Sequence, residues 1–476
     1  MGNCPTRLRR RGSSPIGLGP SPYFAGPHVT RHGKTALLEG GALFSILALR
    51  IASGTSANLS FLALAMYALV GRTQALRALA LAWLIGLLNG RLVPDASFAA
   101  GGRYVVFIAA ASSVLVRQSR LPPIALRLGL ALLTTGAFLI VHSLLVSPYP
   151  DVSILKAVSW TVVALTVVLG WAGLNVHERD ALGWQIFFGL ALVMLASLPL
   201  LASPIGYQLN GEGFEGILSH PQVFGPTMAL LCAWAMSRLL GQPRPNWAYA
   251  IVAACSLMLT FRSGSRTAGL AMVSGVTVAF IVALALSTWS AHAVVPGLRS
   301  GRVHAAAAAT LLTLLLGGGA FVGDAETFIA KGTESRSVAD AYKASRGGLV
   351  DEMWANIEEN PFLGIGFGIA SEPGLMVVTR DTATGLPLSA PVEKGVLPVA
   401  TLEEVGLLGS VLVAVALALL VIQSSKGGVE SFAVALTALF LNMGESTFFS
   451  PSGLGLLPLI LLGWAFSCGL PGQQST

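Results

Sequence analysis

Charged residues are scarce in this sequence. Asp, Glu, Lys and Arg make up 11% of the 476 residues, whereas 54% are hydrophobic, and soluble domains carry roughly 25% charged residues. The chain has too little polar surface to cover a globule of its size in water, which excludes a soluble enzyme. Apolar runs of membrane-spanning length recur from Thr35 almost to the C-terminus, as in a polytopic membrane protein.

The sequence has only four cysteines, and their positions do not favour a disulfide or a metal site. Cys4 lies in a basic N-terminal stretch, Cys232 and Cys255 lie inside apolar runs, and Cys468 is near the C-terminus. No pair shares a polar loop, where disulfides and zinc sites form. We therefore expect no metal and no other cofactor.

The positive charge is spread rather than gathered. A net charge of +7 would suit nucleic acid, but the basic residues fall in short loops between hydrophobic segments, where they act as topology signals. Nucleic acid is excluded as a partner. Their bias toward one face predicts that both termini are cytoplasmic.

Apolar stretches of about 17 to 25 residues predict an all-α fold with about 12 to 14 transmembrane helices. Residues 1–35 are basic, lack a signal-peptide core and are expected to be a disordered cytoplasmic tail. Residues 36–323 would hold eleven helices, residues 396–470 the last ones, and residues 471–476 a short tail. The expected spans are 36–53, 56–71, 75–90, 103–117, 124–147, 152–172, 181–202, 221–240, 247–262, 266–288, 303–323, 396–423, 429–445 and 452–470.

Residues 324–395 form the one domain-sized polar interruption, and the topology places them outside the cytoplasm. Within this large extracytoplasmic loop, residues 346–361 predict an amphipathic helix. Its apolar face is formed by Leu349, Met353, Trp354 and Ile357, and Asn360-Pro361 ends it. We expect an ordered cap over the membrane-embedded helices.

Arg262 and Arg266 lie four residues apart in the sequence FRSGSRTAG, at the boundary of two predicted helices. One interpretation is a pair that snorkels to the interface, because arginine near hydrocarbon costs roughly 2.5 to 3.5 kcal/mol. The other is an anion site on the extracytoplasmic side of the membrane. We favour it because arginine is otherwise depleted on that side and because the residues next to the pair are small, which leaves room for a ligand. The paired N–H donors of a guanidinium group suit a pyrophosphate, and Arg346 in the cap would supply a further guanidinium group. Arg336 is more simply explained as a solvated charge.

Carboxylates gather after the cap. Glu393 and Lys394 precede an apolar helix, and Glu403 and Glu404 lie inside it. An ionisable group within a membrane helix is a functional hypothesis by default. The alternatives are a salt bridge to a neighbouring arginine for the pair and a solvated loop charge for Glu393.

Two weaker patterns carry no function. The GIGFG run at 364–368 resembles part of a dinucleotide fingerprint, but no strand precedes it, so its glycines predict a tight turn. No histidine falls between Asp324 and Gly395, which excludes a cap histidine as a base. His142 and His220 are interpreted as structural.

Four segments, in order, resemble the O-antigen ligase and polymerase superfamily of bacterial envelope glycosyltransferases. They are ILSHPQVFGPTMALL, SGSRTAG, SRGGLVDEMWANIEENPFLGIGFG and LPVATLEEVGLLG, and they cover the half from about Ile217 to Leu420. The resemblance implies a GT-C-like membrane glycosyltransferase in the bacterial inner membrane, with its active site on the extracytoplasmic face.

The resemblance also implies the reaction. Such enzymes transfer a glycan from an undecaprenyl-pyrophosphate carrier to a glycan or lipid-linked acceptor, without a metal, alongside a flippase and a chain-length regulator. Arg266 and Arg346 match the family arginines that hold the pyrophosphate. Glu404 matches a family acidic position and is, with Glu393, a candidate catalytic residue. Glu393 is the preferred base, and attack opposite the leaving group would invert the anomeric carbon.

Three functions stay open at this point. Many ligases carry a His-Asn pair where this chain has Glu393-Lys394-Gly395, so a polymerase of O-antigen or exopolysaccharide is favoured over a ligase that attaches glycan to lipid A core. A secondary transporter would also have many helices with few buried charges, but no internal repeat is visible.

Overall fold

A computed structural model describes the chain over residues 33–96, 98–118, 121–209, 213–286, 295–305, 347–380, 394–451 and 453–471, with single residues or short stretches at 308, 385, 387–390 and 392. The expected N-terminal tail and the predicted span 303–323 beyond its first residues lie outside them.

The described chain is mostly helical, as the sequence predicts. The helices of the first half are α1 (Gly33–Ala52), α2 (Gly54–Ala68), α3 (Arg72–Gly86), α4 (Ala99–Val116), α5 (Pro123–Val146), α6 (Pro150–Ala172) and α7 (Val176–Ser197). Those of the second half are α8 (Pro221–Gly241), α9 (Trp247–Arg262), α10 (Arg266–Leu286), α15 (Gly348–Glu359), α16 (Leu397–Lys426), α17 (Val429–Phe440) and α18 (Leu456–Cys468). The 3₁₀ turns are η1 (Leu198–Ala202), η2 (Pro204–Gly206), η3 (Pro296–Arg299), η5 (Pro373–Leu375) and η6 (Leu441–Met443).

Local sequence explains where many helices begin. Proline occupies the first helical position of α5, α6 and α8, where its missing N–H costs no hydrogen bond. Asn175 and Glu178 form a reciprocal capping box at the start of α7. These signals let apolar runs break into separate helices without long loops.

Six of the described helices are long and apolar enough to cross a membrane: α5, α6, α7 with η1, α8, α10 and α16. Four shorter apolar helices, of 10 to 17 residues, lie within α4, at α9, at α17 with η6 and at α18. The chain is thus membrane-embedded, and the total of 12 to 14 spans stays a prediction. Two expected spans are shorter as helices, because η6 ends the one at 429–445 and α18 begins only at Leu456.

The helix ends fall into two groups at opposite ends of the bundle. One group lies at the same end as α15, and we call it the cap end. The helix ends there are joined by hydrogen bonds from Arg50 to the Ile85 carbonyl, Ser219 to Leu87, Phe214 to Arg262, His142 to Leu363 and Ser446 to Lys394. At the opposite end the links are Arg72 to Gly173, Arg179 to Ser467, Arg302 to Pro245 and Arg238 to Glu430. The alternation expected of successive spans is therefore present.

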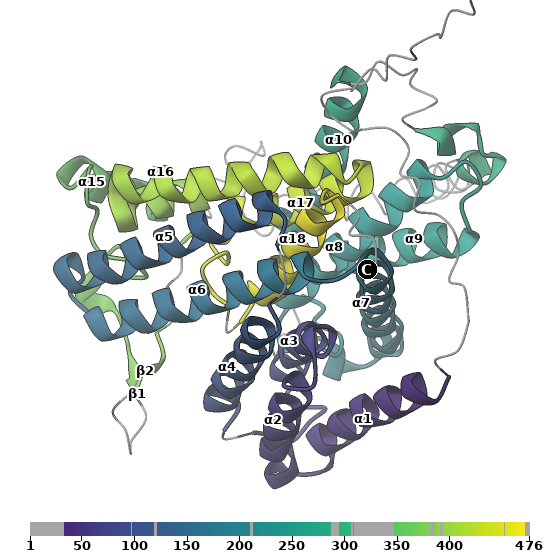
Figure 1. Ribbon diagram of the computed structural model, residues 1–476, viewed down its shortest axis with the longest axis horizontal. Helices are drawn as coiled ribbons and strands as arrows, with labels where there is room; N and C mark the ends of the chain where they lie inside the picture. The colour runs from purple at the N-terminus through teal and green to yellow at the C-terminus, as the bar shows by residue number, and fades with distance from the viewer. Residues whose placement is uncertain are drawn as a thin grey trace, which may run out of the picture.

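The cap end is organised by three helices that run side by side, α5, α6 and α16 (Figure 1). Helix α15 packs on α16. A two-stranded antiparallel hairpin, β1 (Thr379–Arg380) with β2 (Pro387–Ser389), projects beyond α6 on the side away from α15 (Figure 1). Arg380 of the hairpin pairs with Asp151 at the start of α6 at 2.5 Å. The hairpin was not predicted, and the pair anchors it to the helices.

The predicted amphipathic helix is present as α15. Met353 and Ile357 are buried and Leu349 is half-buried, whereas Trp354 is 46% exposed. Helix α15 packs on α16, and its apolar face is thus buried at Met353 and Ile357 and exposed at Trp354. The extracytoplasmic position and full extent of the predicted loop 324–395 stay predictions.

Candidate functional site

The turn between α9 and α10 presents both predicted arginines. Arg262 is the last residue of α9 and is exposed, and Arg266 is the first of α10 and is half-buried, with polar or charge contacts of its own. Gly264 between them has φ 69°, in the left-handed region that favours glycine. The prediction that this pair marks the boundary of two helices is confirmed.

The turn is held from two sides. The Phe214 backbone N–H donates to the Arg262 carbonyl at 3.0 Å. Helix α8 approaches so closely that a Cβ on Gly225 would lie 2.5 Å from Ser263 Oγ and 2.6 Å from Ser265 Cβ. The position of the arginine turn therefore depends on a residue without a side chain in α8.

A buried carboxylate supports the same region. Glu215 accepts a hydrogen bond from Asn89 Nδ2 at 3.0 Å and lies 3.4 Å from Arg91 Nη2. Burial raises the pKa of this carboxyl above its ordinary value, opposed by the Arg91 charge and the Asn89 hydrogen bond. The segment that holds Arg262 is thus itself tied to the loop after α3.

A small cavity of about 30 Å³ lies beside the arginine turn. It is large enough for ordered water, and it lies among α8, α10, α18 and the segment after α17. Its polar lining is Gln222, Thr227, Ser265, Thr267, Glu445 and Thr447. The cavity joins two of the resembling segments, since Gln222 belongs to the first and Ser265 and Thr267 to the second.

Residues 441–449 form the link between the cavity and the cap. Asn442 Oδ1 accepts from the backbone N–H of Thr447 at 2.9 Å and of Phe448 at 2.7 Å. The Ser446 N–H donates to the Lys394 carbonyl at 3.1 Å. This linking segment therefore ties the cavity wall to the start of α16.

The carboxylates predicted inside α16 are buried and paired. Lys394 Nζ lies 2.5 Å from Glu403 Oε2 and 3.4 Å from Glu404 Oε1. All three side chains are less than 9% exposed. The cation is a lysine from the preceding loop, not the arginine that the sequence suggested as the alternative.

The same carboxylates hold the cap. Asn356 Nδ2 of α15 donates to Glu403 Oε1 at 2.7 Å, and the Gly368 N–H donates to Glu404 Oε2 at 2.7 Å. Each carboxylate therefore accepts one hydrogen bond from the cap and forms an ion pair with Lys394, which offsets part of the cost of burying it. Glu403 Oε2 and Lys394 Nζ form no hydrogen bond with the described residues, so the cluster rests on charge attraction at that point. Glu404 positions the cap in this geometry, and a direct catalytic role for it stays a prediction.

A break in α16 makes this docking possible. Gly406 has φ 63° and ψ −169° within the helix, a conformation almost confined to glycine. The carbonyls of Glu403 and Glu404 are thereby freed to accept from the N–H groups of Ile365 at 2.9 Å and Gly366 at 3.0 Å. The predicted GIGFG turn is thus paired with α16.

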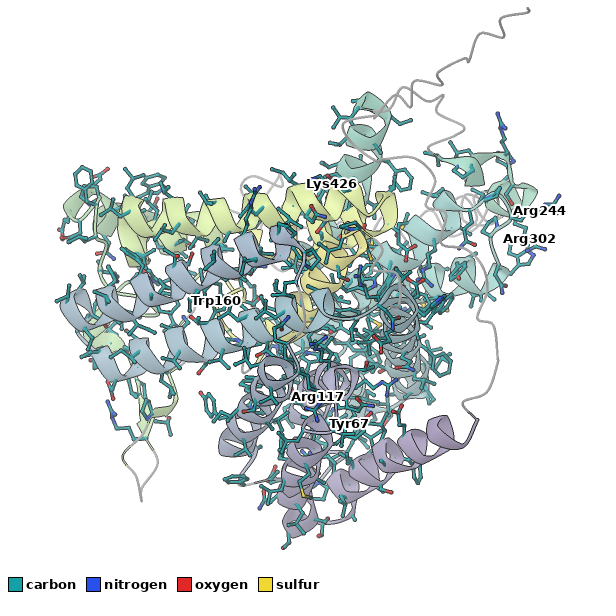
Figure 2. All side chains as sticks on the ribbon, viewed as in Figure 1. Tyr67, Arg117, Trp160, Arg244, Arg302 and Lys426 are labelled. Carbon is teal, nitrogen blue, oxygen red and sulfur yellow. The ribbon has the colours of Figure 1, made fainter. Side chains whose placement is uncertain are left out.

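A second lysine borders the cluster. Lys156 Nζ of α6 lies 5.2 Å from the centre of the Phe367 ring, and the charges of Glu404 and Lys394 both act on it. Trp160, one turn further along α6 (Figure 2), packs on Phe449 with ring centres 5.0 Å apart. A cation in a membrane helix is costly unless it has charged or polar partners, and hydropathy alone did not single out Lys156.

The remaining predicted site residues divide into two sets. Arg346, Arg336 and Glu393 lie outside the described residues, although Gly347 and Lys394 beside two of them are described. His142 donates from Nε2 to the Leu363 carbonyl at 2.5 Å, and His220 caps α8 through Nδ1. The structural interpretation of both histidines fits these contacts.

The sequence did not point to Glu445, Gln222, Asn356 or Lys156. Glu445 follows a short apolar helix and has contacts of its own, so nothing in local composition marks it as part of a cavity. Among the described residues, no group of three or more His, Cys, Asp or Glu side chains could hold a metal ion.

The chain matches no model of a known protein family, and no characterised protein matches it significantly. The resemblance to O-antigen ligases and polymerases therefore remains a prediction from four short segments.

Proposed function

We propose that this protein is a membrane glycosyltransferase that transfers a glycan from an undecaprenyl-pyrophosphate carrier to a sugar hydroxyl, most directly as a polymerase of O-antigen or exopolysaccharide repeat units. The observation that carries the proposal is the meeting of the four resembling segments at one end of the bundle. Gln222 and Ser265 share a cavity whose wall is hydrogen-bonded to Lys394, and Lys394 pairs with Glu403 beneath the cap. If the four segments contribute to one active site, they must lie together in this way.

The arginines would serve the leaving group. As the bond from the anomeric carbon to the pyrophosphate oxygen breaks, negative charge grows on the departing carrier, and fixed cations can stabilise it by several kcal/mol. Arg262 and Arg266 stand at the end of two apolar helices. Arg346 would reach the same phosphates from the cap.

A carboxylate would serve the acceptor. The acceptor oxygen forms its bond to the anomeric carbon opposite the pyrophosphate, and its proton passes to a base, which contributes about 10²- to 10⁴-fold. Glu404 is already occupied by the Gly368 N–H and Lys394, so Glu393 is our proposed base. This route inverts the anomeric carbon.

The test replaces Arg266 and Arg346 separately by alanine in the producing bacterium. We expect polymer to be lost and single repeat units to accumulate on the lipid carrier, while the protein stays in the membrane. Exposed Arg127 at the opposite end of α5 gives the matched control, since Arg127→Ala should leave polymer unchanged.

The readouts are gel analysis of polymer and mass spectrometry of lipid-linked glycan. Wild-type polymer in either arginine variant refutes the proposal. Full-length polymer retained on the carrier in a deletion strain indicates a ligase instead of a polymerase.

A further inference from the structure

A second hollow, of about 500 Å³, lies at the end of the bundle opposite the cap. The loop between α8 and α9 and the segment around η3 form its walls. Its arginines are Arg244, Arg299 and Arg302, and Trp247 stands beside them. Figure 2 shows Arg244 and Arg302 near each other, at the end of the molecule away from α15 in Figure 1.

The platform under these arginines is fixed. Arg302 Nη1 donates to the Pro245 carbonyl at 2.9 Å. At Gly297 a Cβ would lie 2.5 Å from the Leu239 carbonyl oxygen and 2.6 Å from that of Leu240, so η3 sits directly on the end of α8. The two walls therefore keep their spacing without a ligand.

No described carboxylate forms an ion pair with the arginines of the hollow. Arg244, Arg299 and Arg302 are all exposed, and the described lining contains no carboxylate. Like charges held together repel each other, and a bound anion would relieve that repulsion. Guanidinium groups bind phosphate oxygens through paired N–H donors.

The apolar neighbours distinguish between two sources of phosphate. Trp247 is 44% exposed and Leu298 is 43% exposed, and tryptophan is favoured at the level of lipid headgroups. A free phosphate ion would make no use of these side chains. Basic pockets next to membrane helices suit anionic headgroups.

We propose that Arg244, Arg299 and Arg302, with Trp247, form a binding site for the phosphate headgroup of an anionic phospholipid. The site is separate from the cap end and does not depend on the proposed glycan transfer. It would fix this end of the bundle against the leaflet that faces it.

The experiment uses native mass spectrometry of the full-length, detergent-solubilised protein titrated with phosphatidylglycerol. The double variant Arg244→Gln/Arg299→Gln keeps Arg302 and its bond to Pro245, so the platform is retained. At about 1 kcal/mol for each arginine near the headgroup, we expect affinity for the tightest lipid to fall about thirty-fold. The matched control, Arg127→Gln/Lys426→Gln, removes two exposed basic residues from the same end and should bind like wild type.

Three results would overturn the proposal. Equal affinity of wild type and the arginine double variant is one, and an equal loss in the control is another. Displacement of the lipid by inorganic phosphate at equal concentration would assign the hollow to a free anion. Stronger retention of phosphatidylglycerol than of phosphatidylcholine by wild type alone supports the headgroup site.

Discussion

Lys394 is a buried cation between two buried carboxylates, and no other described cation forms an ion pair with Glu403 or Glu404. Such a cluster contributes little net stability while it is intact, because desolvation opposes the attraction, but removal of one partner leaves charge unpaired in a dry site. The value of the cluster is therefore positional. It fixes the loop before α16, the helix itself and the cap in one arrangement.

At the residue scale we predict that Lys394→Met lowers the free energy of unfolding by about 3 to 5 kcal/mol. Glu403 and Glu404 would then face each other without a cation. The measurement is denaturant unfolding of the purified protein in mixed micelles. Lys426→Met is the control, since Lys426 is exposed at the other end of the same helix, and equal stability of the two variants would contradict the cluster's role.

The sequence predicted that the two carboxylates of this cluster are special, but it did not predict which side chains they contact. Glu403 and Glu404 were identified because a carboxylate in an apolar helix is rare. Lys394 was not identified as their partner, because only the geometry of the loop before α16 brings its Nζ back over the helix. Asn356 lies 47 positions before Glu403, and a hydrogen bond across that distance leaves no local pattern.

Helix α16 shows how one backbone position organises a larger element. Its first two turns carry the carboxylates, and the break at Gly406 lets the 361–368 loop pair with freed carbonyls. Hydropathy predicted the helix over 396–423, since its residues from Val405 to Ile422 are apolar except for Ser410. It did not predict the break, because an isolated glycine in an apolar helix is common.

At the element scale we predict that Gly406→Ala releases the cap from α16. Alanine in this conformation costs about 1 to 3 kcal/mol, and its Cβ would lie 2.2 Å from the Phe362 carbonyl carbon. Proteolysis within residues 360–370 should become faster. Gly189→Ala in α7, where a Cβ meets nothing within 4 Å, should leave the cleavage rate unchanged, and equal rates in both variants would argue against a docked cap.

At the scale of the whole molecule, two polar ends flank one apolar bundle, and they differ in chemistry. The cap end combines an arginine turn, a small polar cavity and a paired carboxylate cluster. The opposite end carries arginines bound to helix-end carbonyls, together with Arg238 beneath the Trp184 ring at 4.2 Å and paired with Glu430. The lengths of the apolar runs predicted most of the helices from the sequence. That the four distant segments lie together could be seen only in the folded structure.

The most direct test of glycan transfer uses the purified protein in nanodiscs with a polyprenyl-pyrophosphate-linked repeat unit, a chelator and no nucleotide sugar. We predict longer lipid-linked glycans with release of one polyprenyl pyrophosphate per bond formed, and a rate about 10²- to 10⁴-fold lower in Glu393→Gln. Unchanged repeat units, together with uptake of a solute by the same protein in liposomes, would contradict it and indicate a transporter.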